Sequence, residues 1–365
     1  MGASIYLDRL DRVRKAMADQ GVDVLLLSVG HDLPYLTGYQ AMPLERLTML
    51  VVPRDGDATM VIPRLEAPRV EEQPGVFSLV PWNETDDPSA IVADLAAGAT
   101  TAAVGDQMWA RFLVELLPRM SGTEFRRAVD VVGPLRMVKD AAEVEALRAA
   151  GAAADRVAHQ LHAGEIPLVG RTEAQVSADI SARLLAEGHD KVNFAIVAAG
   201  ENAASPHHHG GDRVITAGEI VLCDFGGTMA GYCSDTTRCV FTGEPTAEIA
   251  DAYAVLLEAQ QASVASATVG TPCQDVDRAA RQIIADAGYG DYFVHRTGHG
   301  IGMEEHEDPY IVEGNDRPLV AGHAFSVEPG IYVPGRWGMR LEDIIVATGD
   351  GPEPLNSSDH GLVGV

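Results

Sequence analysis

The segment of residues 295–307, HRTGHGIGMEEHE, contains three histidines, three glutamates and three glycines. Imidazole and carboxylate groups bind divalent metal ions and transfer protons near neutral pH, so this segment is a candidate catalytic loop. His295 and His299 are four residues apart and would share one face of a helix, but the interspersed glycines disfavour a helix. Glycines instead let the backbone approach an ion or a substrate closely. We therefore expect one of the histidines to bind a metal ion and the others to donate hydrogen bonds or move protons.

A second candidate group is a pair of aspartates in EIVLCDFGGTMAGYCSDTTRCVF, where two apolar stretches flank a glycine-rich turn. If this segment is a hairpin with its turn centred between Met229 and Ala230, Asp224 and Asp235 lie directly opposite each other, with Cβ atoms ~5 Å apart. Two carboxylates in an apolar sheet repel each other, so one would take up a proton unless a cation lay between them. A divalent ion removes this repulsion. The alternative is that each aspartate caps a turn or pairs with a base such as Arg238.

Two glutamates occupy expected strand positions further along the chain. Glu328 ends the apolar stretch HAFSVEPG, and Glu342 lies in GMRLEDIIV, where Arg340 is expected on the same strand face. Taken alone, Glu342 could simply form a salt bridge with Arg340. Together with the two aspartates and one imidazole, however, the glutamates form an oxygen-rich set that suits two divalent ions such as Mn²⁺, Co²⁺ or Zn²⁺. A water shared by two such ions becomes a hydroxide-like nucleophile near neutral pH.

The net charge and the cysteine content indicate which partners and which cellular compartment to expect. A formal net charge of -26 disfavours nucleic acid and anionic membrane surfaces as partners. No apolar run approaches the ~18 residues that a membrane span requires, so we expect no membrane partner. The cysteines are too few for a disulfide framework and lack the paired spacing of a zinc site, so we expect free, buried thiols in a cytoplasmic protein. These cysteines are Cys223, Cys233, Cys239 and Cys273.

The apolar pattern predicts two domains, residues 1–135 and 136–365. The first begins with an amphipathic helix, followed by the buried strand VDVLLLSV and the strand pair RLTMLVVPRDGDATMVIPR, which predicts an α/β domain. In the second, a long helix follows a Gly-Pro pair, and strand pairs with tight turns predict an antiparallel sheet with helices on one face, an α+β architecture. Further helices are expected near 172–187 and 246–268, with strands near 192–199, 219–225 and 232–241.

The motifs resemble those of the metallopeptidase family of methionine aminopeptidase, prolidase and aminopeptidase P. The resemblance is carried by DFGGTMAGYCSDTTR, HRTGHGIGMEEHE, VEPGIYV and GMRLED, and it extends from about residue 136 to the end. About the first 130 residues resemble, less sharply, the creatinase-type N-terminal domain of prolidases and aminopeptidases P. The resemblance implies a pita-bread fold for the second domain, with a curved antiparallel sheet and helices outside it.

The resemblance also implies a role for each candidate residue. Asp235 and Glu342 would bridge or chelate two metal ions, and Glu328 would both bind metal and act as the base for the water. The full set of implied metal ligands is Asp224, Asp235, His299, Glu328 and Glu342. The implied catalytic residues are Glu328, His207 on the substrate side, His295 and His306 at the scissile carbonyl and the developing oxyanion, and Arg340, which would orient Glu342 or a substrate carboxylate.

The function implied by the resemblance is metal-dependent hydrolysis of Xaa-Pro bonds. The chain length favours a dipeptidase, with an aminopeptidase P-like enzyme as the alternative. Methionine aminopeptidases usually lack the N-terminal domain, and metal-free creatinase-like amidinohydrolases and non-enzymatic binding relatives lack ligands that this sequence has. We therefore expect a small peptide as substrate, two divalent ions as cofactors, with Mn²⁺ ahead of Co²⁺ or Zn²⁺, and a cytoplasmic homodimer.

Overall fold

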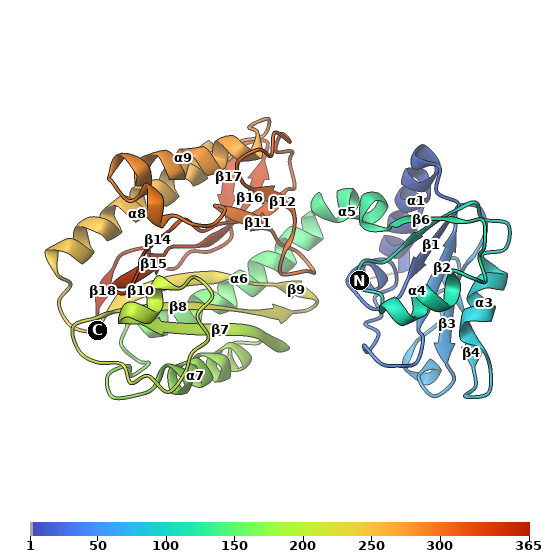
Figure 1. Ribbon diagram of the computed structural model, residues 1–365, viewed down its shortest axis with the longest axis horizontal. Helices are drawn as coiled ribbons and strands as arrows, with labels where there is room; N and C mark the ends of the chain where they lie inside the picture. Colours follow the sequence, from blue (N-terminus) through green and yellow to red (C-terminus); the bar gives the residue numbers. More distant parts are fainter. Residues whose placement is uncertain (1–2) are drawn as a thin grey trace. The chain divides into compact units, whose positions relative to one another are not determined.

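The computed structural model describes residues 3–365, and the chain divides into two compact units, Met1–Arg136 and Met137–Val365 (Figure 1). Each unit encloses its own buried apolar core. Both units combine helices with sheets, so the predicted mixed architecture is confirmed. No helix among residues 3–365 has the length and apolar character needed to span a bilayer.

The first unit is built on a six-stranded mixed sheet with the strand order β4-β3-β2-β1-β5-β6. The predicted opening helix is α1, the predicted buried strand is β1, and the predicted strand pair is the antiparallel pair β2–β3. Buried side chains such as Leu26, Val51 and Phe112 form the core between the sheet and its helices. The elements are α1 Ala3–Gln20, β1 Val24–Leu27, α2 Asp32–Thr37, β2 Met49–Pro53, β3 Ala58–Pro63, η1 Ala67–Arg69, β4 Phe77–Trp82, α3 Pro88–Leu95, β5 Thr101–Val104, α4 Ala110–Leu116, β6 Glu124–Arg127 and α5 Val129–Met137.

The second unit contains two five-stranded sheets, β18-β10-β8-β7 with β9 paired to β8, and β12-β11-β13-β16-β17, together with the pair β14–β15. Nearly all of these strand pairs are antiparallel, as predicted. The elements are α6 Ala141–His162, α7 Glu173–Ala186, β7 Lys191–Ala199, η2 Gly200–Ala204, β8 Ile220–Met229, β9 Tyr232–Cys233, β10 Thr236–Phe241, α8 Ala247–Ser266, α9 Cys273–Asp286, η3 Gly290–Tyr292, β11 Gly298–Gly300, β12 Glu307–Ile311, β13 Ala324–Val327, β14 Gly330–Val333, β15 Trp337–Arg340, β16 Asp343–Thr348, β17 Gly351–Pro354 and β18 Val363–Gly364.

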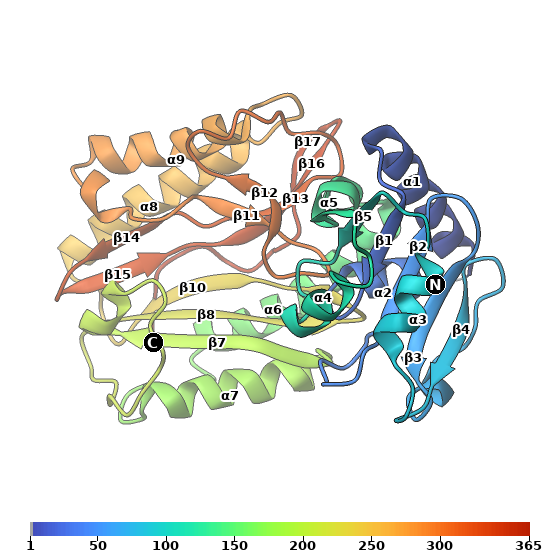
Figure 2. The ribbon, with the colours of Figure 1, turned by 45° about the vertical axis from the view of Figure 1, so that its right-hand side comes forward.

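Helices of the second unit cover the outer faces of its sheets. Figures 1 and 2 show α7 running along β7, and apolar residues of α6 and α7 pack with those of β7, β8 and β10 in one core cluster. Both helices begin with a capping box, formed by Asp140 with Glu143 and by Thr172 with Gln175. Helix α9 was not predicted from the sequence, although Val276, Ala280 and Ile284 repeat at helical spacing and are buried.

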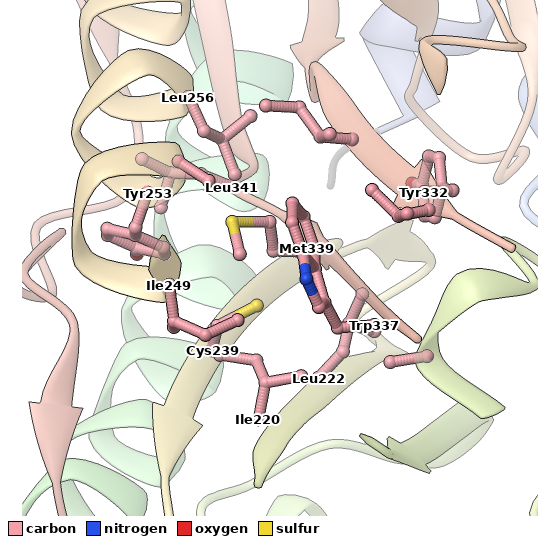
Figure 3. Packing of buried hydrophobic residues seen from close by; sticks show 14 of the residues in the cluster. Ile220, Leu222, Cys239, Ile249, Tyr253, Leu256, Tyr332, Trp337, Met339 and Leu341 are labelled. Atoms are coloured by element: carbon pink, nitrogen blue, oxygen red, sulfur yellow. The ribbon is translucent and has the colours of Figure 1, made fainter. Parts of the chain in front are cut away.

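A second core cluster backs the strands that carry the candidate site. Side chains from α8, β8, β10 and β15 surround Met339, among them Leu222, Cys239 and Leu256 (Figure 3). Burial of each large apolar side chain contributes roughly 1.5–3 kcal/mol to stability, so this cluster fixes the relative positions of β8 and β15. Asp224 on β8 and Arg340 on β15 are thereby held on a rigid scaffold.

Candidate active site

A cavity of about 500 Å³ lies in the second unit. The structure brings to it every site residue named from the sequence, namely His207, Asp224, Asp235, His295, His299, His306, Glu328, Arg340 and Glu342. Two other charged residues, Arg296 and Glu305, and three with apolar side chains, Phe194, Ile196 and Pro206, complete its lining. Residues from β7, β8 and β11 and from the ends of β13 and β15 therefore converge on one pocket.

The hairpin that carries the two aspartates has a different register from the predicted one. Thr237, not Asp235, lies opposite Asp224. The two-residue turn is formed by Ala230 and Gly231, which both have positive φ, at 49° and 85°. The turn centre is thus one residue later than predicted, which shifts the pairing by two residues. Because side chains alternate between faces with a period of two, this shift leaves Asp224 and Asp235 on the same face, diagonal to each other.

The segment GMRLEDIIV is not one continuous strand. Strand β15 ends at Arg340 and β16 begins at Asp343, so the expectation that Arg340 and Glu342 share one strand face is wrong. Glu342 instead lies in an isolated antiparallel bridge with Thr237, whose hydroxyl donates to its Oε2 over 2.6 Å. Arg238 pairs with Asp343 at 2.7 Å, so neither candidate aspartate has Arg238 as a partner.

The carboxylates converge on the imidazole of His299. One ligand atom each from Asp235, His299 and Glu342 lies within 4.8 Å of the others, and all three residues are buried. His299 Nε2 is also 3.2 Å from Oε1 of Glu328. The Nδ1 atom of His299 donates to the carbonyl oxygen of Gly300 over 3.1 Å, which directs Nε2 at the carboxylates. Without metal, Nε2 donates to Glu328, and a metal ion bound at Nε2 would displace that proton. His299 can therefore act as a ligand in its neutral form.

The charge of this cluster is poorly balanced by the protein itself. Burial raises the pKa of Asp235 and of Glu342 well above their ordinary values, and neighbouring carboxylates raise both further. Burial also raises the pKa of Asp224, although Arg340 acts in the opposite direction. Burial opposes ionisation of Glu328 too, but the hydrogen bond from His299 and the nearby positive charges lower its pKa to about 2. Two carboxylates thus lack a compensating cation.

These residues fit a divalent metal centre. Oδ1 of Asp224 is buried and has no hydrogen-bond partner among residues 3–365, whereas its Oδ2 accepts from Arg340. A buried carboxylate oxygen without a donor costs free energy that a metal–oxygen contact would recover. The donor set is rich in oxygen with one imidazole, which suits Mn²⁺, Co²⁺ or Zn²⁺.

Arg340 organises a hydrogen-bond network instead of contacting Glu342 directly. It ion-pairs with Asp224, and its Nη1 donates to the Tyr332 hydroxyl oxygen over 2.9 Å. Burial lowers the pKa of His295, and its neutral ring accepts at Nε2 from the Tyr332 hydroxyl at 2.9 Å. Nδ1 of His295 donates to the carbonyl oxygen of Arg296 at 2.6 Å. Both nitrogens of His295 are thus engaged, and hydrogen bonds connect Arg340 to Glu342 through the Thr237 hydroxyl.

The three consecutive histidines are directed to different surroundings. His207 lines the cavity. His208 instead lies 2.8 Å from a carboxylate oxygen of Glu173, and His209 is exposed to solvent. The His306 ring, which also lines the cavity, packs edge-on against His299 with centroids 4.0 Å apart, and its partial burial lowers the pKa of His306 to about 4. His306 is therefore neutral at physiological pH.

We expected the glycines of the histidine segment to let the backbone approach an ion or a substrate, but the space beside Gly298 and Gly300 is filled by neighbouring strands. A Cβ atom at Gly298 would lie 1.8 Å from the backbone oxygen of Ser326, and one at Gly300 would lie 2.3 Å from the backbone oxygen of Asp308. These glycines allow β11 to pack between β12 and β13. Their function is to bring His299 close to its neighbouring strands.

We expect Gly298→Ala to destabilise the protein by about 3 kcal/mol, because the clashing atom belongs to a paired strand and cannot move away freely. Urea unfolding of the metal-free protein measures this change. Gly349→Ala is the matched control, because a Cβ there meets nothing within 4 Å and the backbone conformation is ordinary, and we expect a change within about 0.5 kcal/mol. Equal stabilities of the two variants would contradict the packing role.

The cysteines are free and buried, as predicted. Burial raises the pKa of Cys233 and of Cys239 to about 12 and that of Cys273 to about 11, and it raises the pKa of Cys223 as well. Since the thiolate is the reactive form, we expect almost no reaction with a thiol reagent such as DTNB in the native protein. All 4 thiols should react after denaturation. Rapid labelling of the native protein would contradict their burial.

Several residues that support the site were not identified from the sequence. Ser326 accepts from the backbone N–H of His299 at 3.0 Å and donates to Glu328 at 3.0 Å. The hydroxyl oxygens of Thr237 and Tyr332 accept hydrogen bonds from the Arg340 guanidinium. In the sequence, a polar side chain in an otherwise apolar strand could have indicated these residues, because such a group needs a hydrogen-bond partner when it is buried.

Comparison with known proteins agrees with this geometry. Residues 145–349 match the model of metallopeptidase family M24, and residues 9–138 match that of the creatinase/prolidase N-terminal domain. A probable dipeptidase PepE of Mycobacterium tuberculosis is 45% identical over 366 residues, covering 99% of this chain and 97% of that protein. A Xaa-Pro dipeptidase of Lactobacillus delbrueckii subsp. lactis is 35% identical over 361 residues, covering 97% and 98%.

Solved structures of similar proteins also match nearly the whole chain. Dipeptidase PepE from Mycobacterium ulcerans superposes with a TM-score of 0.93 at 47% identity, covering 100% of this chain and 99% of that chain. Recombinant prolidase from Thermococcus sibiricus superposes with a TM-score of 0.92 at 33% identity, covering 99% of both chains. The resemblance inferred from the motifs is therefore confirmed: the chain belongs to metallopeptidase family M24 and carries a creatinase/prolidase N-terminal domain.

Proposed function

We propose that the protein is a metal-dependent dipeptidase that hydrolyses Xaa-Pro dipeptides. The observation that carries this proposal is the convergence of Asp235, His299 and Glu342 beside a cavity of about 500 Å³, a volume that suits a small ligand. The names of the relatives support it, because they include a probable dipeptidase and a Xaa-Pro dipeptidase. An aminopeptidase P-like activity on longer peptides is the alternative.

In this proposal, the five implied ligands hold two divalent ions, with Mn²⁺ as the expected metal: Asp224, Asp235, His299, Glu328 and Glu342. Such ions supply Lewis acidity and an activated water when bound. Glu328 is held by Ser326 and lies 3.2 Å from His299, and in this proposal it would accept the proton of the water as well as bind metal. Residues outside the ligand set would bind and orient the peptide.

The side chains around the ligands divide the remaining tasks. His306 is neutral and can donate an N–H to the scissile carbonyl oxygen without adding a charge. We assign His207 to the substrate side of the cavity, because it lines the pocket. His295 has both ring nitrogens engaged, so we propose that it acts through Tyr332 to hold Arg340 instead of contacting the carbonyl itself.

Hydrolysis assays with Ala-Pro test the proposal. We expect activity with Mn²⁺, loss of activity on incubation with EDTA, and recovery when Mn²⁺ is added back. Ala-Ala and the tripeptide Ala-Pro-Ala are the comparison substrates, since faster cleavage of the tripeptide would favour the aminopeptidase alternative. Hydrolysis of Ala-Pro that is unaffected by EDTA would contradict a metal-dependent mechanism.

The metal, the assembly and the location are separate parts of the proposal. Elemental analysis of protein purified without added metal determines which ion is retained. Light scattering during gel filtration determines whether the chain is the expected homodimer. The cytoplasmic location stays a prediction from composition, and fractionation of the source cells would test it.

A further inference from the structure

A fully buried carboxylate lies outside the cavity at the start of α7. The Glu173 side chain is 0% exposed, yet it pairs with none of the ionic groups of the metal cluster. Its Oε1 accepts from the backbone N–H of Ala199 at 2.8 Å and from the Asn202 amide at 3.1 Å. Its Oε2 lies 2.8 Å from His208 Nε2 and 3.4 Å from the backbone nitrogen of Gly211. All four partners belong to the segment 199–211.

The backbone of the first turn of α7 also binds the end of this segment and Arg213, which follows it. The N–H of Glu173 donates to the carbonyl oxygen of Arg213 at 3.0 Å, and the N–H of Ala174 donates to that of Gly211 at 3.1 Å. These N–H groups have no acceptor within the helix, so the segment satisfies them. The positive end of the helix dipole and the surrounding donors together offset the cost of burying the Glu173 carboxylate. The helix and the segment thus hold each other by reciprocal hydrogen bonds.

The segment held by Glu173 carries two residues of the cavity lining, Pro206 and His207. His207 is exposed, and its imidazole makes no hydrogen bond to another group among residues 3–365. Its position is therefore determined by the backbone on either side of it. His208, the next residue, is the one whose imidazole reaches Glu173.

We propose that Glu173 and His208 form a latch that positions His207 and Pro206 at the cavity and thereby sets the affinity for the peptide substrate. This inference rests on the proposed function, in which His207 contacts the substrate. Glu173 does not line the cavity, so it acts as a positioning residue. Without the latch, the segment would have to be ordered when substrate binds, which weakens binding more than it slows the chemical step.

Glu173→Gln tests the latch with little change in volume. Glutamine replaces one acceptor oxygen by an amino group, which would face donors from Asn202, His208 or Gly211. We expect KM for Ala-Pro to rise about ten-fold while kcat changes less than about two-fold. Metal content should stay at the wild-type value, and amide hydrogen exchange in residues 199–211 should accelerate.

Substitutions of the adjacent histidines separate the latch from a general effect on folding. His208→Ala should reproduce the rise in KM, and His208→Gln, which keeps a donor for Glu173, should restore most of the affinity. His208 is 20% exposed, so we expect His208→Ala to fold even if Glu173→Gln does not. His209→Ala is the matched control, because His209 is exposed, and we expect an unchanged KM.

A double-mutant cycle tests whether the latch acts through His207. If it does, Glu173→Gln should add little to the loss caused by His207→Ala. Additive losses, or an unchanged KM and unchanged exchange in both latch variants, would overturn the proposal. If the wild-type protein fails to hydrolyse any dipeptide, the proposed function fails, but hydrogen exchange in residues 199–211 still tests the latch by itself.

Discussion

Asp235→Asn is expected to lower kcat/KM for Ala-Pro by about 10³-fold or more and to remove at least one bound metal ion. Asp235 has one oxygen within 4.8 Å of the ligand atoms of His299 and Glu342, so it would hold a metal ion together with them. Asparagine has nearly the same shape but no negative charge, so it binds a divalent ion weakly. Elemental analysis and steady-state kinetics at saturating Mn²⁺ measure the two effects.

The same substitution should stabilise the metal-free protein. Burial and the charge of Glu342 raise the pKa of Asp235, so its ionised form costs folding free energy when no cation is bound. A raised folded-state pKa means that stability is lost as pH rises through that pKa. We therefore expect the metal-free variant to melt about 3 °C above the metal-free wild type near pH 8. The difference should vanish below the ordinary aspartate pKa of about 3.9, where both states are protonated.

Asp251→Asn is the matched control for both measurements, because Asp251 is exposed on α8. We expect its metal content, rate and melting temperature to equal those of the wild type. A variant at Asp235 that kept its metal and its rate would show that this carboxylate is not a ligand. Unchanged melting behaviour of the metal-free variant would show instead that the unbound carboxylates are relieved by another cation.

Two of the candidate carboxylates could be singled out from the sequence because a buried charge in an apolar strand costs free energy, whereas the full set and its roles came from the family resemblance. Asp224 and Glu328 interrupt apolar strands, and a buried carboxylate requires a partner wherever the strand lies. The pairing of the hairpin could not be predicted as well, because Gly226, Gly227 and Gly231 left the turn centre open to a shift of one residue. The error did not change the face of Asp235, since a shift of two in pairing preserves side-chain alternation.

The supporting contacts depend on tertiary structure that local patterns do not contain. Thr237 and Glu342 are more than one hundred residues apart, and their hydrogen bond exists only because β10 meets the break between β15 and β16. The role of Gly298 likewise depends on the approach of Ser326 from another strand. A glycine-rich loop near a metal and a glycine-rich strand between two neighbours look alike in the sequence.

Arg340→Met is expected to destabilise the metal-free protein by about 3–5 kcal/mol. Both partners of the Arg340–Asp224 ion pair are buried, with side-chain exposures of 5% and 10%. Methionine fills a similar volume but leaves Asp224 without its cation and removes the donor to the Tyr332 hydroxyl. An unpaired buried charge is far more costly than an absent ion pair, so this substitution should be among the most destabilising in the second unit.

A bound metal should reduce that loss, because it supplies positive charge at Asp224 in place of the guanidinium. Urea unfolding with and without Mn²⁺ compares the two states. Arg336→Met is the matched control: Arg336 pairs with Glu248 at 2.8 Å, but the side chains are 55% and 46% exposed, so we expect a change below about 1 kcal/mol. If Arg340→Met were no more destabilising than Arg336→Met in the metal-free state, Asp224 would have to be protonated there, and the ion pair with Arg340 would not contribute to stability.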